Sequence, residues 1–136
     1  MNITGILETS LYVDDVVRAA DFYAQLFGFD QLVADDRFCA LSVAGRQVLL
    51  LFRKGATTKA MEFPGGTLPP HDGSGTTHLA FSIPAADLES WEQRLVEHGI
   101  VIESRVAWPR GGQSIYFRDP DGHLAELVTP GCWAIY

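Results

Sequence analysis

Three side chains, Glu8, His78 and Glu126, have the types and the spacing that could form a metal site. Glu8 opens the strand-like run ETSLYV, and His78 opens the similar run HLAFSI. Glu126 lies in a third such run, HLAELV, which follows the turn DPDG. Carboxylate oxygens and imidazole nitrogens are common ligands of divalent ions. Their matching places in similar segments predict that the three side chains share one ion.

This ligand set indicates the chemistry of the site. Two carboxylates are costly to bury together unless a cation neutralises them. One imidazole with two carboxylates favours Mn²⁺, Ni²⁺, Fe²⁺ or Co²⁺ over Zn²⁺ or Mg²⁺. Three protein ligands leave positions at which a substrate can bind through two adjacent oxygens. The ion would then act as a Lewis acid on a developing negative charge.

The elements that must position these residues form a two-fold internal repeat. Each half predicts a strand, a helix that ends at a glycine (Gly28 or Gly99), and three further strands. The expected later strands are 29–34, 37–43 and 46–53 in the first half, and 100–107, 113–118 and 124–129 in the second. The halves are a first module at 5–53, a Gly- and Pro-rich linker at 54–75, and a second module at 76–131.

The strand pattern predicts an α+β fold in a single domain of residues 1–136. Paired strand–helix–three-strand modules would form a cupped, barrel-like mixed sheet with the helices outside. Alternation of side chains along a strand places Glu8, His78 and Glu126 on faces that do not pack against a helix. We therefore expect the three side chains to converge.

Composition limits the possible partners. The chain has 136 residues, 47% of them hydrophobic, and a formal net charge of −7. That charge disfavours nucleic acid and anionic membranes and leaves a small-molecule substrate as the expected partner. The start of the sequence lacks the pattern of a secretory signal, so a cytoplasmic location is expected. Cys39 is expected to be a buried thiol, and a disulfide with Cys132 remains open.

Three longer segments resemble one known group of proteins. The segments LYVDDVVRAADFYAQLFGF, GTTHLAFSI and YFRDPDGHLAELVTPG together resemble the vicinal oxygen chelate superfamily. This superfamily includes glyoxalase I, bleomycin-resistance proteins, fosfomycin-resistance thiol transferases and extradiol dioxygenases. The resemblance implies paired βαβββ modules, a homodimer, and a divalent metal held by the first and last strands of the modules.

The resemblance assigns each candidate ligand a place. Glu8 and His78 take the first-strand places, and Glu126 takes the last-strand place of the second module. Aligning Gly45 with Gly122 puts Leu49 in the fourth place, as an apolar wall that contacts the substrate. Because leucine cannot ligate, glyoxalase I activity is disfavoured, and Glu8 or Glu126 would have to act as the catalytic base. The carboxylate in the first place also weakens a dioxygenase interpretation.

Further residues are candidates for substrate contact. Ser114 and Tyr116 share a strand face, and residues of these types contact the substrate in the fosfomycin-resistance relatives; the alternative is an ordinary pair within a strand. Arg110, in a glycine-rich loop, could bind an anionic group or be a surface residue. His71 could cover the site as a proton shuttle or be an exposed loop residue.

Three functions follow from these patterns. The first is a divalent-metal-dependent lyase, isomerase or thiol transferase, of which thiol transfer best tolerates the leucine. The second is a metal-free binder of aromatic drugs, like the bleomycin-resistance proteins, which the acidic balance and the Trp and Tyr content would suit. The third is a module that uses only the fold to bind a partner.

Overall fold

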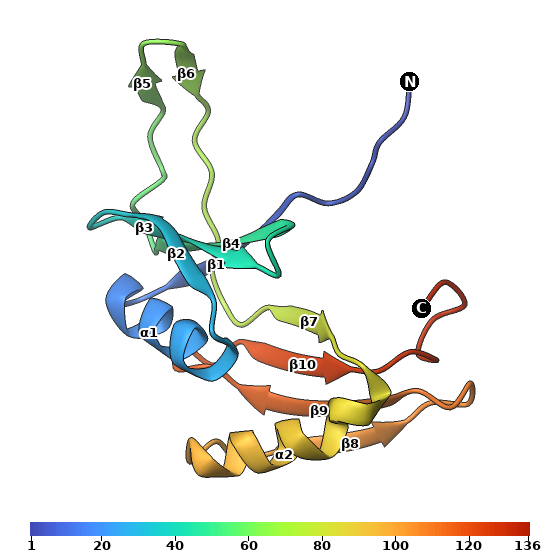
Figure 1. The fold of residues 1–136 in the computed structure, drawn as a ribbon. Coiled ribbons are helices and arrows are strands. Elements are labelled where there is room, and N and C mark those ends of the chain that lie inside the picture. Colours follow the sequence, from blue (N-terminus) through green and yellow to red (C-terminus); the bar gives the residue numbers. More distant parts are fainter. The chain divides into compact units, whose positions relative to one another are not determined.

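The computed structural model describes all 136 residues, which divide into two compact units, Met1–Gly75 and Thr76–Tyr136. The expected second module begins at this division. The helices and strands are coloured along the chain in Figure 1. Unit 1 contains β1 (Glu8–Val13), α1 (Val16–Phe27), β2 (Asp30–Ala34), β3 (Phe38–Val43), β4 (Gln47–Arg53), β5 (Met61–Phe63) and β6 (Gly66–Leu68). Unit 2 contains β7 (His78–Ser82), the 3₁₀ turn η1 (Ala85–Asp87), α2 (Leu88–Glu97), β8 (Ser104–Ala107), β9 (Gln113–Arg118) and β10 (Leu124–Val128).

Unit 1 is a four-stranded mixed sheet with one helix on its face. The strand order is β1-β4-β3-β2; β1 and β4 run parallel, and the other pairs are antiparallel. Asp15 caps α1 by accepting from Arg18 N at 3.0 Å, and Gly28 ends the helix in the left-handed conformation at φ 71°. The apolar stripe of α1 packs against the buried residues of β3 and β4.

Unit 2 repeats the same topology. Its order is β7-β10-β9-β8, again with a parallel first pair and antiparallel pairs after it. The helix α2 lies along this sheet with Leu95 fully buried (Figure 1). Arg105 on β8 reaches the helix, since its Nε donates to Glu92 at 2.7 Å. The opposite face of the sheet is therefore the one without a helix.

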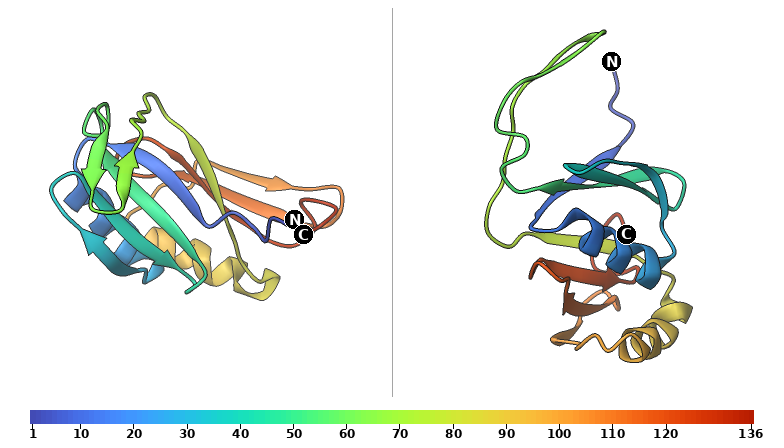
Figure 2. Two further views of the ribbon diagram at one scale, coloured as in Figure 1. Left: turned by 90° about the horizontal axis from the view of Figure 1, so that it is seen from above. Right: turned by 90° about the vertical axis from the view of Figure 1, so that its left-hand side faces the viewer.

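The α+β fold of two βαβββ modules that the sequence predicts is confirmed. Two details differ. The strand expected at 100–107 is shorter, since β8 begins at Ser104. The expected linker 54–75 contains the hairpin β5–β6, which stands away from the four-stranded sheet of its own unit in both Figures 1 and 2. Pro64 and Gly65 form the tip of this hairpin between two very short strands. Neither helix is long and apolar enough to cross a membrane.

Candidate metal centre

His78 and Glu126 are neighbours on the helix-free face of unit 2. His78 Nε2 lies 3.1 Å from Glu126 Oε2. The parallel register of β7 and β10 pairs His78 with Leu124, and Glu126 with Ala80 two residues further on. The imidazole is 49% exposed and the carboxylate 7% exposed. A largely buried carboxylate is thus joined to a ring that solvent can reach.

The second ring nitrogen of His78 fixes the tautomer of the neutral ring. Nδ1 lies 3.0 Å from the carbonyl oxygen of Leu124. Because a carbonyl only accepts, Nδ1 carries the hydrogen and donates it. In the neutral ring Nε2 then has a lone pair, and this lone pair faces an oxygen of Glu126. Two such acceptors repel each other unless a proton or a cation lies between them.

Tyr116 holds the other oxygen of the carboxylate. It is directly opposite Glu126 in the antiparallel β9–β10 pair, and its hydroxyl donates to Oε1 at 3.0 Å. Burial, together with this bond to a negative group, raises the pKa of the Tyr116 phenol. The phenol therefore remains a hydrogen donor at neutral pH. One carboxylate oxygen is held, and the other faces His78.

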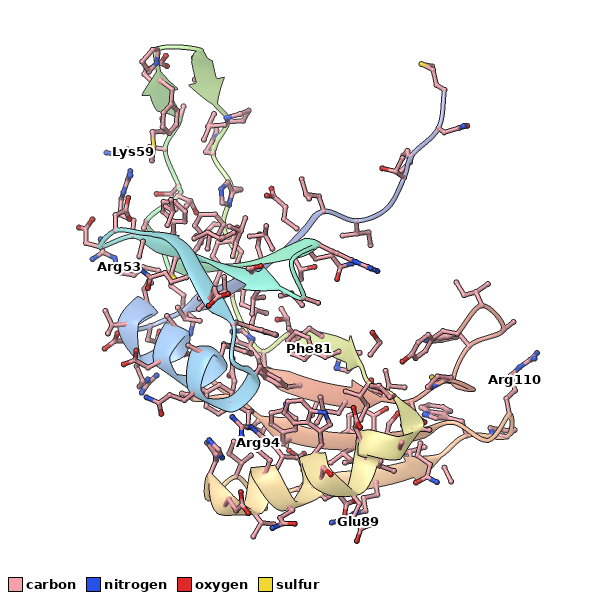
Figure 3. The ribbon with its side chains drawn as sticks, in the orientation of Figure 1. Arg53, Lys59, Phe81, Glu89, Arg94 and Arg110 are labelled. Carbon is pink, nitrogen blue, oxygen red and sulfur yellow. The ribbon has the colours of Figure 1, made fainter.

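The remaining candidates for substrate contact in unit 2 are placed differently. Ser114 shares the face of Tyr116, is 1% exposed, and accepts from Trp108 Nε1 at 2.7 Å. Arg110 is exposed in the loop between β8 and β9, and Figure 3 shows it projecting outward from the tip of that loop. The structure thus gathers Ser114, Tyr116 and Glu126 on one face and leaves Arg110 outside that group.

Glu8 holds the place in unit 1 that His78 holds in unit 2. It begins β1 and pairs with Val48, as His78 begins β7 and pairs with Leu124. Its side chain is exposed. Within either unit, no three His, Cys, Asp or Glu side chains gather closely enough to hold an ion. His78 and Glu126 therefore form a pair within unit 2, and the part that Glu8 takes stays a prediction.

The strand register corrects the alignment of Leu49 with Glu126. Glu126 pairs with Ala80, two residues after His78, and the matching residue of unit 1 is Ser10, two after Glu8. Ser10 pairs with Leu50. Leu49 is 2% exposed and belongs to the core beneath α1. The fourth place of the repeat is therefore Leu50, which is also unable to ligate.

Aligning Gly45 with Gly122 gave the wrong strand register because the two glycines occupy different positions in their turns. After β3, the first two loop residues are left-handed, Ala44 at φ 52° and Gly45 at φ 65°. After β9, Asp119 O accepts from Gly122 N at 3.0 Å to close a turn, and Gly122 is the fourth loop residue, at φ 85°. Matching glycine to glycine thus shifts the strands by one residue, which turns each side chain to the other face.

An aromatic cluster lies on the helix-free face of unit 1, at the end of β1 that carries Tyr12. Tyr12 and Phe52 stack with ring centroids 5.9 Å apart, and Phe38 and Phe52 with centroids 5.7 Å apart. His71 lies edge-on to Phe52 at 4.8 Å, and its Nδ1 is hydrogen-bonded to the Tyr12 hydroxyl. A Cβ on Gly73 would overlap the Tyr12 ring, so the chain crosses this ring closely. Alternation along β1 and β4 was the signal for this cluster, which the sequence interpretation missed.

The two cysteines are free thiols in different surroundings. Cys39 is completely buried in unit 1, and burial raises its pKa. Burial and the nearby carboxylate of Glu126 raise the pKa of the Cys132 thiol. The Cys132 thiol is therefore protonated at neutral pH and is influenced by the charge of Glu126.

The donor set of unit 2 suits a divalent cation. An imidazole that donates Nδ1–H to a backbone carbonyl and a carboxylate held by a phenol are the supports that metal ligands commonly have. Nε2 of His78 and Oε2 of Glu126 are left as two adjacent acceptors. The class that the fold defines is that of α+β proteins built from repeated βαβββ modules, and the His78–Glu126 pair lies on the helix-free face of the second module.

Comparison with known proteins identifies the family. The chain belongs to the Glyoxalase/Bleomycin resistance protein/Dioxygenase superfamily, whose family model matches residues 5–127. It is 34% identical to metallothiol transferase FosB of Bacillus licheniformis over 93% of this chain and 76% of that protein. It is 30% identical to FosB of Shouchella clausii over 93% of this chain and 81% of that protein. The solved structure of lactoylglutathione lyase from Agrobacterium tumefaciens matches with TM-score 0.89 and 30% identity, over 98% of this chain and 99% of that one.

These findings confirm the predicted superfamily. They also confirm the expectation of a glyoxalase-superfamily enzyme, since the relatives named above are transferases and a lyase.

Proposed function

We propose that this protein is a divalent-metal-dependent thiol transferase that adds a thiol to a small electrophilic substrate bound through adjacent oxygens. The observation that carries the proposal is the pair His78 and Glu126, whose Nε2 and Oε2 lie 3.1 Å apart. Similarity to FosB, a metallothiol transferase, supports the choice of reaction. The apolar residue at the fourth place, Leu50, fits a reaction that needs no fourth ligand.

The ligands we propose are His78 Nε2, Glu126 Oε2 and a carboxylate oxygen of Glu8. Hydrogen bonds within unit 2 fix the orientations of His78 and Glu126. Glu8 is included because it occupies the place in unit 1 that His78 occupies in unit 2. The set favours Mn²⁺, Ni²⁺, Fe²⁺ or Co²⁺. When bound, the ion supplies Lewis acidity toward the substrate oxygens.

The side chains of the protein have separate tasks in this proposal. Tyr116 keeps Glu126 in one orientation, and Leu124 O keeps the His78 ring in one tautomer. Opening of an epoxide by a thiol forms a carbon–sulfur bond and breaks a carbon–oxygen bond. The thiol proton ends on the released oxygen, so atoms and charge balance without an oxidant. An oxygen of Glu8 or Glu126 is the group proposed to carry that proton.

A metal-free binder of flat aromatic molecules is the second candidate function. The cluster of Tyr12, Phe38, Phe52 and His71 favours it, because stacked and partly exposed rings can hold another aromatic ring. Such a binder would not need the His78–Glu126 pair. Metal dependence therefore separates the two functions.

Thermal unfolding with and without Mn²⁺ tests the proposed function. A ligand of the folded state at 100 times its Kd stabilises by about 2.7 kcal/mol, so Mn²⁺ should raise the Tm of the wild-type protein. His78→Ala should abolish this rise while leaving the Tm in EDTA nearly unchanged. His98→Ala is the control, since His98 is an exposed histidine at the end of α2. No Mn²⁺, Ni²⁺, Fe²⁺ or Co²⁺ effect on the wild type would overturn the proposal.

We also propose that the protein works as a homodimer in the cytoplasm, as the family resemblance implies. Analytical ultracentrifugation of the purified chain tests the first point, and fractionation of cells that express it tests the second. A monomer at micromolar concentration would contradict the dimer.

A further inference from the structure

A buried histidine lies beside the first residues of β7 and β10, the strands that carry His78 and Glu126. His123 is 1% exposed and immediately precedes β10. Its Nδ1 accepts from the backbone N–H of Thr77 at 3.0 Å and also lies 3.1 Å from the Thr77 hydroxyl. Because Nδ1 accepts a backbone hydrogen, the ring is neutral and carries its own hydrogen on Nε2. The proposed chemistry makes no use of this group.

The turn before β10 holds His123 in place. Asp119 is 5% exposed, and its Oδ1 accepts from His123 N at 2.8 Å and from Asp121 N at 3.0 Å. The backbone N–H of Asp119 donates to His123 O at 3.1 Å. The residue is thus bonded through both backbone groups and through its ring.

Hydrogen bonds lead from His123 to the candidate ligand. Thr77 donates its N–H to the His123 ring, and its carbonyl accepts from Leu124 N at 2.8 Å. The next residue is His78, whose Nδ1 donates to Leu124 O at 3.0 Å. The imidazole of His123 thus takes the place of a strand carbonyl one step before the β7–β10 ladder begins. It holds Thr77, the residue immediately before β7.

The corresponding place in unit 1 has no buried side chain that accepts a hydrogen bond from the strand backbone. Leu7 O accepts from Val48 N at 2.9 Å, which matches the bond from Leu124 N to Thr77 O. The residue before Val48, at the repeat position of His123, is Gln47. Gln47 is exposed, and its amide donates only a 3.5 Å bond to Ile6 O. The buried ring that accepts from the strand backbone is therefore found in unit 2, which also holds the His78–Glu126 pair.

We propose that His123 is a positioning residue for the metal centre: its neutral ring fixes Thr77 and thereby aims His78 at Glu126. This inference rests on the proposed function. Losing the acceptor would free the start of β7 and widen the range of positions of His78 Nε2. The ion would then bind less tightly although none of its ligands had changed.

Two substitutions of His123 by amide residues test whether the position of the acceptor, rather than the presence of a polar side chain, orients His78. In His123→Asn the side-chain oxygen can stand where Nδ1 stands and accept from Thr77. In His123→Gln the amide extends toward the place of Nε2 and leaves the Thr77 N–H without its acceptor. Calorimetric titration with Mn²⁺ should give affinity lowered by about tenfold to 100-fold for the Gln variant and largely retained for the Asn variant. Gln47→Ala, at the matching place of unit 1, should leave the affinity unchanged.

Hydrogen exchange gives a readout that does not depend on metal. The Thr77 amide should exchange slowly in the wild type and in His123→Asn, and faster in His123→Gln. If the Gln variant does not fold, His123→Leu replaces it, since it removes the acceptor without burying an amide. Equal Mn²⁺ affinities in the wild type and in the Gln or Leu variant overturn this inference and leave the proposed function standing. No Mn²⁺ binding by the wild type overturns both.

Discussion

Tyr116 and Glu126 face each other across β9 and β10, and the phenol hydroxyl donates to Oε1 of the carboxylate at 3.0 Å. This bond leaves Oε2 as the oxygen nearest to His78 Nε2. A carboxylate that is free to rotate would present either oxygen. The phenol thus selects which atom is offered to a cation, and it remains protonated because its pKa is raised.

Removing this hydroxyl should weaken metal binding without emptying the core. Tyr116→Phe keeps the ring, so we expect a loss of stability of about 1 kcal/mol and a fall in Mn²⁺ affinity of about tenfold. Titration calorimetry measures the affinity. Tyr12→Phe is the control, because it removes a hydroxyl from the aromatic cluster of unit 1. Unchanged affinity in Tyr116→Phe would mean that the bond does not orient the ligand.

The thiol of Cys132 reports the charge of Glu126. Burial, and to a smaller extent the carboxylate, raise the thiol pKa, so less of the reactive thiolate is present at neutral pH. In Glu126→Gln the negative charge is gone, and the pKa should fall toward its usual value. Alkylation of Cys132 by iodoacetamide in EDTA should then become faster, and its pH midpoint should move down. Peptide mapping distinguishes this thiol from the buried Cys39.

A rate that is equal in the wild type and in Glu126→Gln would contradict the proximity of the two groups. Glu103→Gln serves as the matched control, because Glu103 is an acidic residue of the same unit that pairs with Arg118. Its substitution should leave the alkylation rate unchanged.

The repeat made much of the fold and part of the site predictable. Periodicity and the glycine after each helix predicted two βαβββ modules, and alternation placed His78 and Glu126 on one helix-free face. Both inferences need only local spacing, which the backbone of strands and helices fixes.

Other features depend on contacts between distant residues. The bond from Tyr116 to Glu126 follows from the β9–β10 register, and the packing of His71 on Phe52 follows from the path of the chain over the sheet. The hairpin β5–β6 escaped prediction because its strands are too short to show alternation. In each case the residue types can be read from the sequence, but the residues that they contact in the fold cannot.

The close crossing at Gly73 can be tested by one methyl group. A Cβ at this position would overlap the Tyr12 ring, so Gly73→Ala must displace either the ring or the chain that crosses it. We expect a loss of stability of about 1–3 kcal/mol and disruption of the bond between Tyr12 and His71. Gly65→Ala is the control, since no atom lies within 4 Å of its added Cβ. Urea unfolding measures both, and equal stabilities would mean that the crossing is loose.

The one-residue correction from Leu49 to Leu50 has the clearest experimental consequence. A charge at position 49 would lie in the core beneath α1, where Leu49 is 2% exposed and a carboxylate would lose its hydration. Leu49→Glu should therefore destabilise the protein by about 4 kcal/mol or more. Leu50 points to the helix-free face and is half-buried, so Leu50→Glu should cost about 1–2 kcal/mol. Urea unfolding in EDTA compares the two variants, and the reverse order would restore the glycine-based alignment of the repeat.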